Sequence, residues 1–415
     1  MLWIPLALAA AAQPQQIPSG LPFEVGSDSS ARVAWGQVIA TPGDDWINDL
    51  VPLSGGNVLG VGFLNRADGS FATDWEAVSV ELQADGAIAS QRRYGEQGGT
   101  DAFWSIAEAA DGRRVFGGFT TRVGPGGING YVLVSRPDGT IIKENGFGYA
   151  GYDRFTDLAP AGDGYVFVGH SQLTDQGAPR RTYIVKTDGS GLFAWERIYG
   201  GAEAWSALYI EPAGDGGFII AGGTDGGGDV DMFVQKVDAD GRQQWRKRVG
   251  TPDWDEVNHG LVVRSDGAIV LTGYTHRRGE RSNDLLAATL SPDGEVERIE
   301  RLGGKGDDRA ILAKADSAGR VWIVGHSTSA GAGGVDMLLA RIGPDGAFDR
   351  AAITIGGAAD DHGTAILPMA DGSLLLGGYS RGLGVGAQDA FVLRLTKPAW
   401  DRPNPAFVRE TVKAP

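Results

Sequence analysis

Residues 199–248 show the clearest pattern of hydrophobic and polar positions in the chain: four short apolar segments separated by polar, glycine-rich stretches. A tight turn, Gly214-Asp215-Gly216-Gly217, separates the first two segments, and Asp238-Ala239-Asp240-Gly241 separates the last two. Short apolar runs bounded by such turns are typical of antiparallel strands joined by hairpins. The pattern predicts four strands, over residues 207–211, 218–221, 232–237 and 244–249.

This segment of about fifty residues recurs along the whole chain. The copies can be aligned on a turn glycine, and successive anchors lie 51 to 56 residues apart. A single four-stranded sheet of this size is marginally stable, so we expect each sheet to pack against its neighbours in a ring. The sequence therefore predicts an all-β, seven-bladed β-propeller of four-stranded antiparallel blades. The seven anchor glycines are Gly56, Gly112, Gly164, Gly216, Gly267, Gly319 and Gly372.

The two ends of the repeat region complement one another. Residues 35–40 (WGQVIA) match residues 245–250 (WRKRVG), which form the predicted fourth strand of copy four. The seventh copy instead runs into Lys397-Pro398 where the turn to its own fourth strand is expected. We therefore predict that residues 32–39 form the fourth strand of the last blade, which closes the ring and removes an open sheet edge.

Composition and the chain ends set the remaining boundaries. Residues 1–12 are apolar and end in alanines, which predicts a signal peptide and a secreted or periplasmic protein; a disordered apolar start of a cytosolic protein is the alternative. Residues 13–31 are expected to be an extended linker, 32–396 the propeller and 397–415 a proline-rich tail. The formal charge of −15 argues against nucleic-acid binding, and no other segment is apolar enough to span a membrane. The absence of cysteine excludes disulfides and thiolate zinc sites.

The repeat resembles the glycine-rich propeller repeat of secreted bacterial and archaeal proteins, over about residues 32–396. This resemblance implies a scaffold or binding role and transfers no catalytic residue. Copies one to three have Glu76, Asn129 and Arg181 where later copies have aspartate, which argues against one identical ligand per blade. The matching residues in copy four are Tyr199-Gly200-Gly201, Asp215-Gly216-Gly217-Phe218, Asp231, Lys236, Asp238, Gly241 and Trp245.

The predicted loops differ between the two faces of the ring. The turns between strands one and two and between strands three and four are mostly short Asp-Gly turns, whereas the other connections are longer and more varied. Function is commonly carried by variable loops on a rigid scaffold, so we expect the site on the loop-rich face. An acid also begins most inner strands there, and its recurrence favours a role in fixing the loop over a ring of ligand-binding carboxylates. These acids are Asp45, Asp101, Asp153, Glu256, Asp308 and Asp361.

Two sets of candidate residues lie on this face. Aromatic side chains there could bind sugar rings or cationic groups, although filling of the gaps between blades is the favoured explanation. They are Trp46, Trp104, Trp205, Trp254, Tyr274 and Tyr379. Acids that do not recur could bind calcium, and these are Asp44, Asp253, Asp255, Asp307, Asp360, Asp225 and Asp229. The histidines, including His170 and His326, are not expected to share a metal.

These residues leave three functional hypotheses. The first is an exported binding scaffold whose ligand is a glycan, a peptide or an envelope protein. The second is a carbohydrate-active hydrolase or lyase that uses Asp255, Asp308 and Asp361 at the mouth of the channel, since glycoside chemistry needs two carboxyl groups in an open cleft. The third is a purely structural module within a larger assembly.

Overall fold

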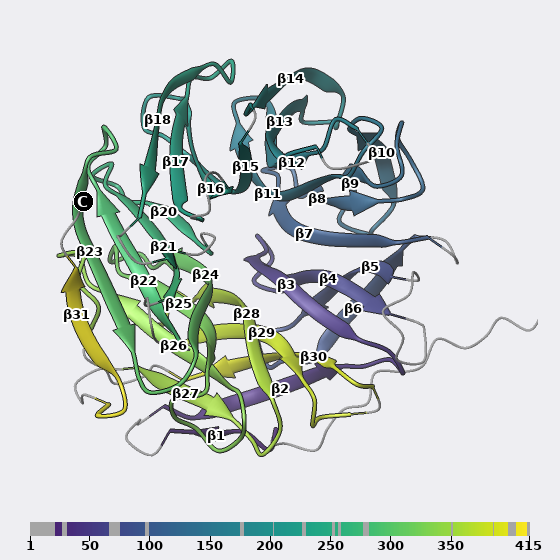
Figure 1. The fold of residues 1–415 in the computed structure, drawn as a ribbon. Helices are drawn as coiled ribbons and strands as arrows, with labels where there is room; N and C mark the ends of the chain where they lie inside the picture. The colour runs from purple at the N-terminus through teal and green to yellow at the C-terminus, as the bar shows by residue number, and fades with distance from the viewer. Residues whose placement is uncertain are drawn as a thin grey trace, which may run out of the picture.

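Seven antiparallel sheets surround a common centre in the computed structural model, with their first strands innermost (Figure 1). This is the predicted seven-bladed β-propeller. Among the described ranges, no helix is long and apolar enough to cross a membrane. The structure describes residues 21–26, 31–65, 75–95, 99–174, 178–201, 203–225, 230–250, 254–255, 259–276, 282–349, 352–384, 386–396 and 404–412.

The first four blades follow one another along the chain, each with its strands in order from the centre outward. Blade 1 contains β3 (Asp45–Pro52), β4 (Val58–Asn65), β5 (Trp75–Leu82) and β6 (Ile88–Tyr94). Blade 2 contains β7 (Asp101–Glu108), β8 (Arg114–Thr120), β9 (Asn129–Ser135) and β10 (Ile141–Phe147). Blade 3 contains β11 (Asp153–Ala161), β12 (Gly164–Ser171), β13 (Arg181–Asp188) and β14 (Phe193–Tyr199). Blade 4 contains β15 (Ala204–Pro212), β16 (Phe218–Asp225), β17 (Met232–Val237) and β18 (Gln243–Val249).

The last three blades include strands from both ends of the chain. Blade 5 contains β19 (Trp254–Asp255), β20 (Leu261–Val263), β21 (Ile269–His276), β22 (Asn283–Leu290), β23 (Val296–Gly303) and, at its outer edge, β31 (Val408–Val412). Blade 6 contains β24 (Asp308–Ala315), β25 (Val321–Ser327), β26 (Asp336–Ile342), β27 (Ile353–Gly356) and β1 (Glu24–Val25). Blade 7 contains β28 (Asp361–Pro368), β29 (Leu374–Ser380), β30 (Asp389–Leu395) and β2 (Val33–Ile39).

The ring closes between the two ends of the repeat region, as predicted. Strand β2 pairs antiparallel with β30, with Val38 opposite Phe391, and supplies the fourth strand of blade 7. Two further pairings were not predicted: β1 pairs with β27, and β31 pairs with β23. Residues 24–25 and 408–412 therefore cover the outer edges of blades 6 and 5, although they lie within the expected linker and tail.

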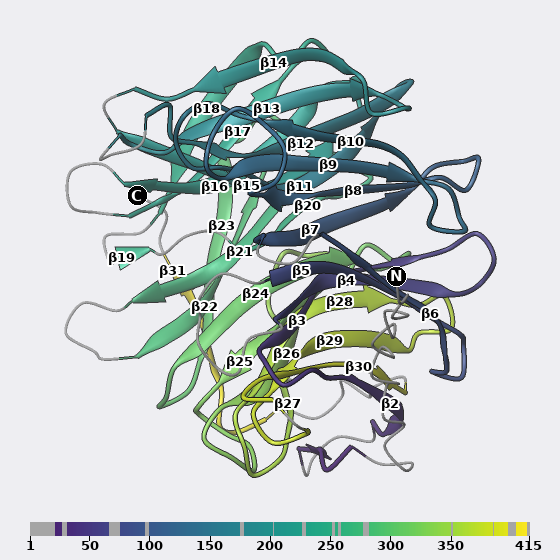
Figure 2. The same cartoon turned by 90° about the vertical axis from the view of Figure 1, so that its right-hand side faces the viewer.

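Hydrophobic cores lie between neighbouring blades, whose sheets stack face to face (Figure 2). The core between blades 2 and 3 includes Val115 and Val132 of one blade and Phe155 and Phe167 of the other. Equivalent clusters join the other neighbouring pairs. Each blade is therefore stabilised by burial against its two neighbours rather than by a core of its own.

A β-bulge in the inner strands shapes the centre of the ring. In blade 1 the register shifts between Ile47 and Asp49, so that Asn48 is the extra residue, and five other blades have the equivalent shift. The recurring glycine of the second strand is required beside this bulge. A Cβ on Gly62 would lie 1.9 Å from the Trp46 carbonyl oxygen, and one on Gly325 would lie 1.8 Å from that of Arg309. Because a bulge re-aims the side chains around it, this feature decides which residues face the centre.

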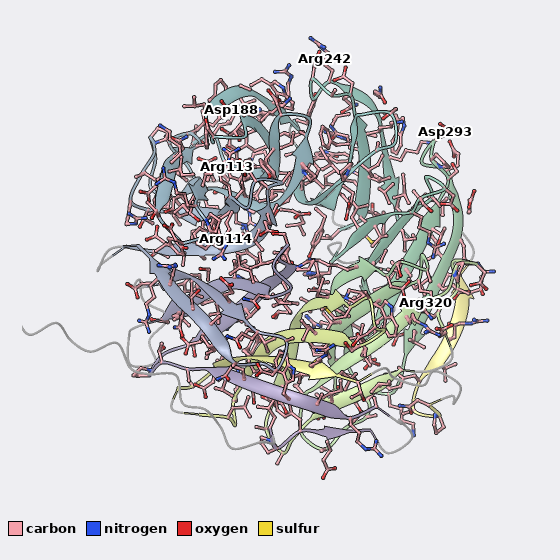
Figure 3. All side chains as sticks on the ribbon, turned by 180° about the vertical axis from the view of Figure 1, so that it is seen from behind. Arg113, Arg114, Asp188, Arg242, Asp293 and Arg320 are labelled. Atoms are coloured by element: carbon pink, nitrogen blue, oxygen red, sulfur yellow. The ribbon has the colours of Figure 1, made fainter. Side chains whose placement is uncertain are left out.

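Short turns occupy the opposite face of the ring. Gly112 and Gly139 have φ values of +82° and +83°, which only glycine adopts without strain. In the view from behind, Arg242 and Asp293 mark two such turns at the outside of the ring (Figure 3). Arg113 of blade 2 donates a hydrogen bond to the Gly189 carbonyl of blade 3. Contacts between neighbouring blades therefore help to stabilise this face.

Candidate functional site

A cavity of about 580 Å³ lies at the centre of the ring. Residues around all seven inner strands contribute to its wall, among them Trp46 of β3, Glu211 of β15 and Lys314 of β24. Small-molecule sites commonly have this size and combine apolar walls with a few polar groups. The central cavity is therefore a well-formed candidate site.

The loop-rich end of the cavity is lined by aromatic and basic side chains. Trp46, Arg154 and His362 each occupy the second position of an inner strand, directly after the loop that leads into the blade. Tyr274 and Tyr379 reach the same wall from the second strands of blades 5 and 7. This end, which we call the mouth, thus brings together residues from blades that are far apart in the sequence.

Part of this aromatic surface is used for packing. Tyr379 stacks on Trp46 with ring centroids 4.5 Å apart, and His362 also stacks on Tyr379, at 4.6 Å. The column continues from Trp46 to Phe63 at 5.4 Å and from Phe63 to Trp75 at 4.4 Å. Because neighbours stack against Trp46 and its indole N–H is bonded to the side chain of Gln388, its ring helps to join blades 7 and 1.

Basic groups and histidines complete the mouth. Arg154 lines the cavity and lies over Trp104, with 5.5 Å between its guanidinium carbon and the ring centroid. Arg309 does not line the cavity, but it lies over Tyr274, which does, at 4.8 Å. Burial lowers the pKa of His259 and of His362 to about 4, so both imidazoles are neutral at pH 7. A neutral imidazole has one donor and one acceptor nitrogen. The mouth therefore offers hydrogen-bonding groups of both kinds next to apolar rings.

The other end of the cavity, which we call the floor, carries three carboxyl groups and one ammonium group. Lys314 crosses from blade 6 to blade 1, where its Nζ lies 2.5 Å from Asp49 Oδ1 and donates to the Leu50 carbonyl at 3.2 Å. Asp157 accepts hydrogen bonds from the backbone N–H groups of Leu158 and Ile210. Glu211 of blade 4 lines the same end of the cavity.

Burial controls the protonation of this floor. It raises the pKa of Glu211 to about 7, against the attraction of the Lys314 ammonium, and it raises the pKa of Asp157 well above its ordinary value. Burial alone would lower the pKa of Lys314, but the carboxyl groups of Asp49, Asp157 and Glu211 outweigh it and raise the pKa. The floor thus contains an ion pair between Asp49 and Lys314 and two carboxyl groups, those of Asp157 and Glu211, whose pKa values burial raises.

Four of the six predicted ligand-binding aromatics line the cavity: Trp46, Trp104, Tyr274 and Tyr379. Trp205 does not. It lies against the sheet of its own blade, beneath the guanidinium groups of Arg246 at 4.5 Å and Arg248 at 5.4 Å. The side chain of Trp254 lies outside the described part of the structure.

The recurring acids hold the corners of the blades. Asp308 accepts hydrogen bonds from the backbone N–H of Gly304 and from two serine hydroxyls, and Asp361 accepts one from the N–H of Gly357. Both side chains are buried and neither lines the cavity. This geometry supports the corner-fixing interpretation for these two candidate catalytic residues. The side chain of the third, Asp255, is not described.

The candidate calcium ligands are dispersed. Asp307 accepts from the backbone N–H of Asn283 and pairs with Arg309, and Asp360 accepts from the N–H of Val335 and pairs with Arg381. Asp44 is buried beside a second pocket. Within the described ranges, no group of three or more histidine, aspartate or glutamate residues could hold a metal ion. Asp229 and Asp253, and the side chains of Asp225 and Asp255, are not described.

Sequence reasoning missed the polar residues that face the cavity. Asp49 and Asp157 each follow a recurring acid by four positions, and Arg154 and His362 follow one directly. The sequence feature that could have identified them is a polar residue in a predicted inner strand, at a repeat position where the other copies have different residues. The position of the bulge, which decides whether such a residue points to the cavity or to a neighbouring blade, is not visible in the sequence.

Comparisons with known proteins show the fold alone. No protein-family model and no curated protein matches the chain. Among solved structures, a fungal alcohol oxidase of the AA5 family in complex with copper has a TM-score of 0.51 and 16% identity, over 86% of this chain and 76% of its own. The polysaccharide lyase Uly1 has a TM-score of 0.50 and 12% identity, over 87% and 91%. An α-L-arabinofuranosidase from Fusarium graminearum has a TM-score of 0.45 and 10% identity, over 85% and 92%.

Proposed function

We propose that this protein binds a carbohydrate that enters the central cavity through its loop-rich mouth. The observation that carries the proposal is the combination, in one cavity, of Trp104 and Tyr379 with Arg154 and His362. Sugar rings present apolar C–H faces that pack on aromatic side chains, and their hydroxyls both donate and accept hydrogen bonds. A peptide or an envelope protein is the other ligand class that the sequence allows.

The size and charge of the cavity support this ligand class. A volume of about 580 Å³ admits more than one small ring. The carboxyl groups of Asp49, Asp157 and Glu211 at the floor are acceptors for the hydroxyl groups of a ligand, and the Lys314 ammonium is a donor. A polyhydroxylated ligand could bond to both ends of the cavity without bringing a net charge.

A glycan array followed by calorimetric titration of the best ligand tests the proposal. Glu211→Gln and Arg154→Met change the floor and the mouth, and Glu297→Gln changes an exposed side chain on β23 as the matched control. We expect the two cavity variants to bind the glycan at least about tenfold more weakly than the control, a loss of about 1.4 kcal/mol. If no glycan binds, or if all three variants bind like the wild type, the proposal is wrong.

A second candidate function is hydrolysis or elimination of the bound carbohydrate. The observation in its favour is the cavity floor, where Glu211, with a pKa raised to about 7 by burial, and Asp49, which pairs with Lys314, both interact with the same ammonium group. A general acid that keeps its proton and a nearby ionised carboxylate are what glycoside cleavage needs. Mass spectrometry of glycans incubated with the protein separates the outcomes, because hydrolysis adds one water to the products and elimination does not.

We also propose that the protein is exported, on the basis of the apolar residues 1–12. The test is the N-terminal sequence of the protein recovered from the periplasm or the culture medium. A mature form that begins near Gln13 would support export, and recovery of the full chain from the cytosol would contradict it.

A further inference from the structure

Two arginines of blade 3 line the central cavity without a carboxylate partner. Arg154 is the second residue of β11, and Arg180 directly precedes β13 on the loop-rich face. Among the described residues, neither guanidinium group forms a salt bridge. Burial lowers the pKa of Arg154, and the side chains with the largest effects on it are Tyr152, Arg180 and Tyr209, none of which is a carboxylate. The mouth of the cavity therefore contains two cations that the protein itself does not neutralise.

Comparison with blade 6 shows why Arg154 lacks a carboxylate partner. Arg309 occupies the same repeat position, as the second residue of β24, and pairs with Asp307 at 2.8 Å. The residue of blade 3 that corresponds to Asp307 is Tyr152, so the acid is missing from this position. Arg309 does not line the cavity, whereas Arg154 does. Blade 3 thus presents to the cavity a cation that blade 6 neutralises and keeps out of it.

The two arginines act together on their surroundings. In the sheet of blade 3, Arg154 is opposite His170, which is opposite Thr182, two residues after Arg180. Burial lowers the pKa of His170 well below its ordinary value, and the charges of Arg154 and Arg180 lower it further. His170 is therefore neutral at pH 7, and the two guanidinium groups give this part of the wall a positive charge. That sign is opposite to the formal charge of −15 on the whole chain, so the positive wall is a local feature of the cavity.

We propose that the carbohydrate bound in the central cavity is acidic, and that Arg154 and Arg180 bind its carboxylate or sulfate group. The inference rests on the proposed function and adds to it the charge of the ligand. Guanidinium groups bind such oxyanions through paired, charge-assisted N–H···O hydrogen bonds. An anion at this place also offsets the repulsion between the two cations. Uncharged hydroxyl groups elsewhere on the same ligand bond to the carboxyl groups and the ammonium group of the floor.

The test compares acidic glycans with matched neutral forms by calorimetric titration at pH 7. The probes are oligomers of polygalacturonate and alginate, each with its carboxyl-reduced form, and oligomers of carrageenan with their desulfated form. We expect at least one acidic oligomer to bind at least about tenfold more tightly than its neutral form, and this preference to shrink as the salt concentration rises. The pair that shows the preference identifies the anion as a carboxylate or a sulfate.

Three variants test the assignment to the two arginines. Arg154→Gln and Arg180→Gln should each lose most of the preference for the acidic oligomer. The matched control is Arg381→Gln, which removes an exposed arginine from the same face of the ring; this arginine pairs with Asp360 and does not line the cavity. The control should keep the preference of the wild type. Arg180 is exposed, so Arg180→Gln keeps the test valid if Arg154→Gln fails to fold.

The other outcomes separate this inference from the proposed function. If the wild type binds neutral glycans as tightly as acidic ones, or if Arg180→Gln and Arg154→Gln keep the preference, the assignment of an acidic ligand is wrong and the proposed function stands. If no glycan binds, acidic or neutral, both are wrong. Titration with triglutamate covers acidic peptides: triglutamate binding that is lost in Arg180→Gln, without binding of any glycan, would overturn both in favour of a peptide ligand.

Discussion

Glu211 is predicted to destabilise the fold at neutral and alkaline pH. Its folded pKa is about 7, whereas the ordinary value is 4.5, so the unfolded chain releases this proton at a lower pH than the folded protein does. The stability of the fold therefore falls as the pH rises from about 4.5 to 7 and stays reduced above that range. The gap corresponds to about 3 kcal/mol, and partial exposure of the side chain to the cavity reduces it to about 2 kcal/mol.

Glu211→Gln removes this penalty while it keeps the shape of the side chain. In urea denaturation, we expect the gain in unfolding free energy over the wild type to be below about 1 kcal/mol at pH 5 and about 2 kcal/mol at pH 8. Glu297→Gln, which changes an exposed side chain on β23, should show no such change between the two pH values. A variant that is no more stable than the wild type at pH 8 would show that the carboxyl group is well solvated in the cavity, and would refute the reasoning.

Three further predictions concern the fold and the acids. Gly325→Ala places a Cβ against a backbone carbonyl and should lower the unfolding free energy measured in urea by about 1–3 kcal/mol or more. In the control Gly55→Ala the added Cβ has nothing within 4 Å, so the unfolding free energy should change by less than about 0.5 kcal/mol. Equal effects of the two substitutions would contradict the close approach at Gly325. Deleting residues 32–39 removes the closing strand and should lower the melting temperature by several degrees, and an unchanged value would mean that the ring does not depend on this strand. Any calcium-induced rise in melting temperature, measured against EDTA, should persist in Asp307→Asn and Asp360→Asn because arginines already pair with these carboxylates; its loss would identify them as calcium ligands.

The fold could be predicted because each blade repeats the same arrangement of short apolar strands and glycine-containing turns. The positive-φ glycine at Gly216 and the match between residues 35–40 and 245–250 are visible in the sequence, and both are in place in the structure. The strands β1 and β31 were not predicted, because their residues have no counterpart in the repeat and their pairing partners are far away in the chain. Local periodicity carries no information about such pairings.

The candidate site could be predicted only in part. The choice of the loop-rich face placed Trp46 and Tyr379 at the mouth. Recurrence indicated that acids such as Asp308 fix the corners, and the structure has them bonded to backbone N–H groups and hydroxyls. The floor could not be predicted, because Glu211 and Lys314 come from blades 4 and 6 and meet only across the closed ring. Their meeting depends on the register that the bulges set in each inner strand.

The most direct test of the central claim is a crystal structure of the protein grown with the tightest-binding glycan from the array. The account predicts sugar density inside the central cavity, with a ring in contact with Trp104 and Arg154 and hydroxyls bonded toward Glu211. Density confined to the turn face or to the outer strands, or an empty cavity at a glycan concentration well above the dissociation constant, would contradict it.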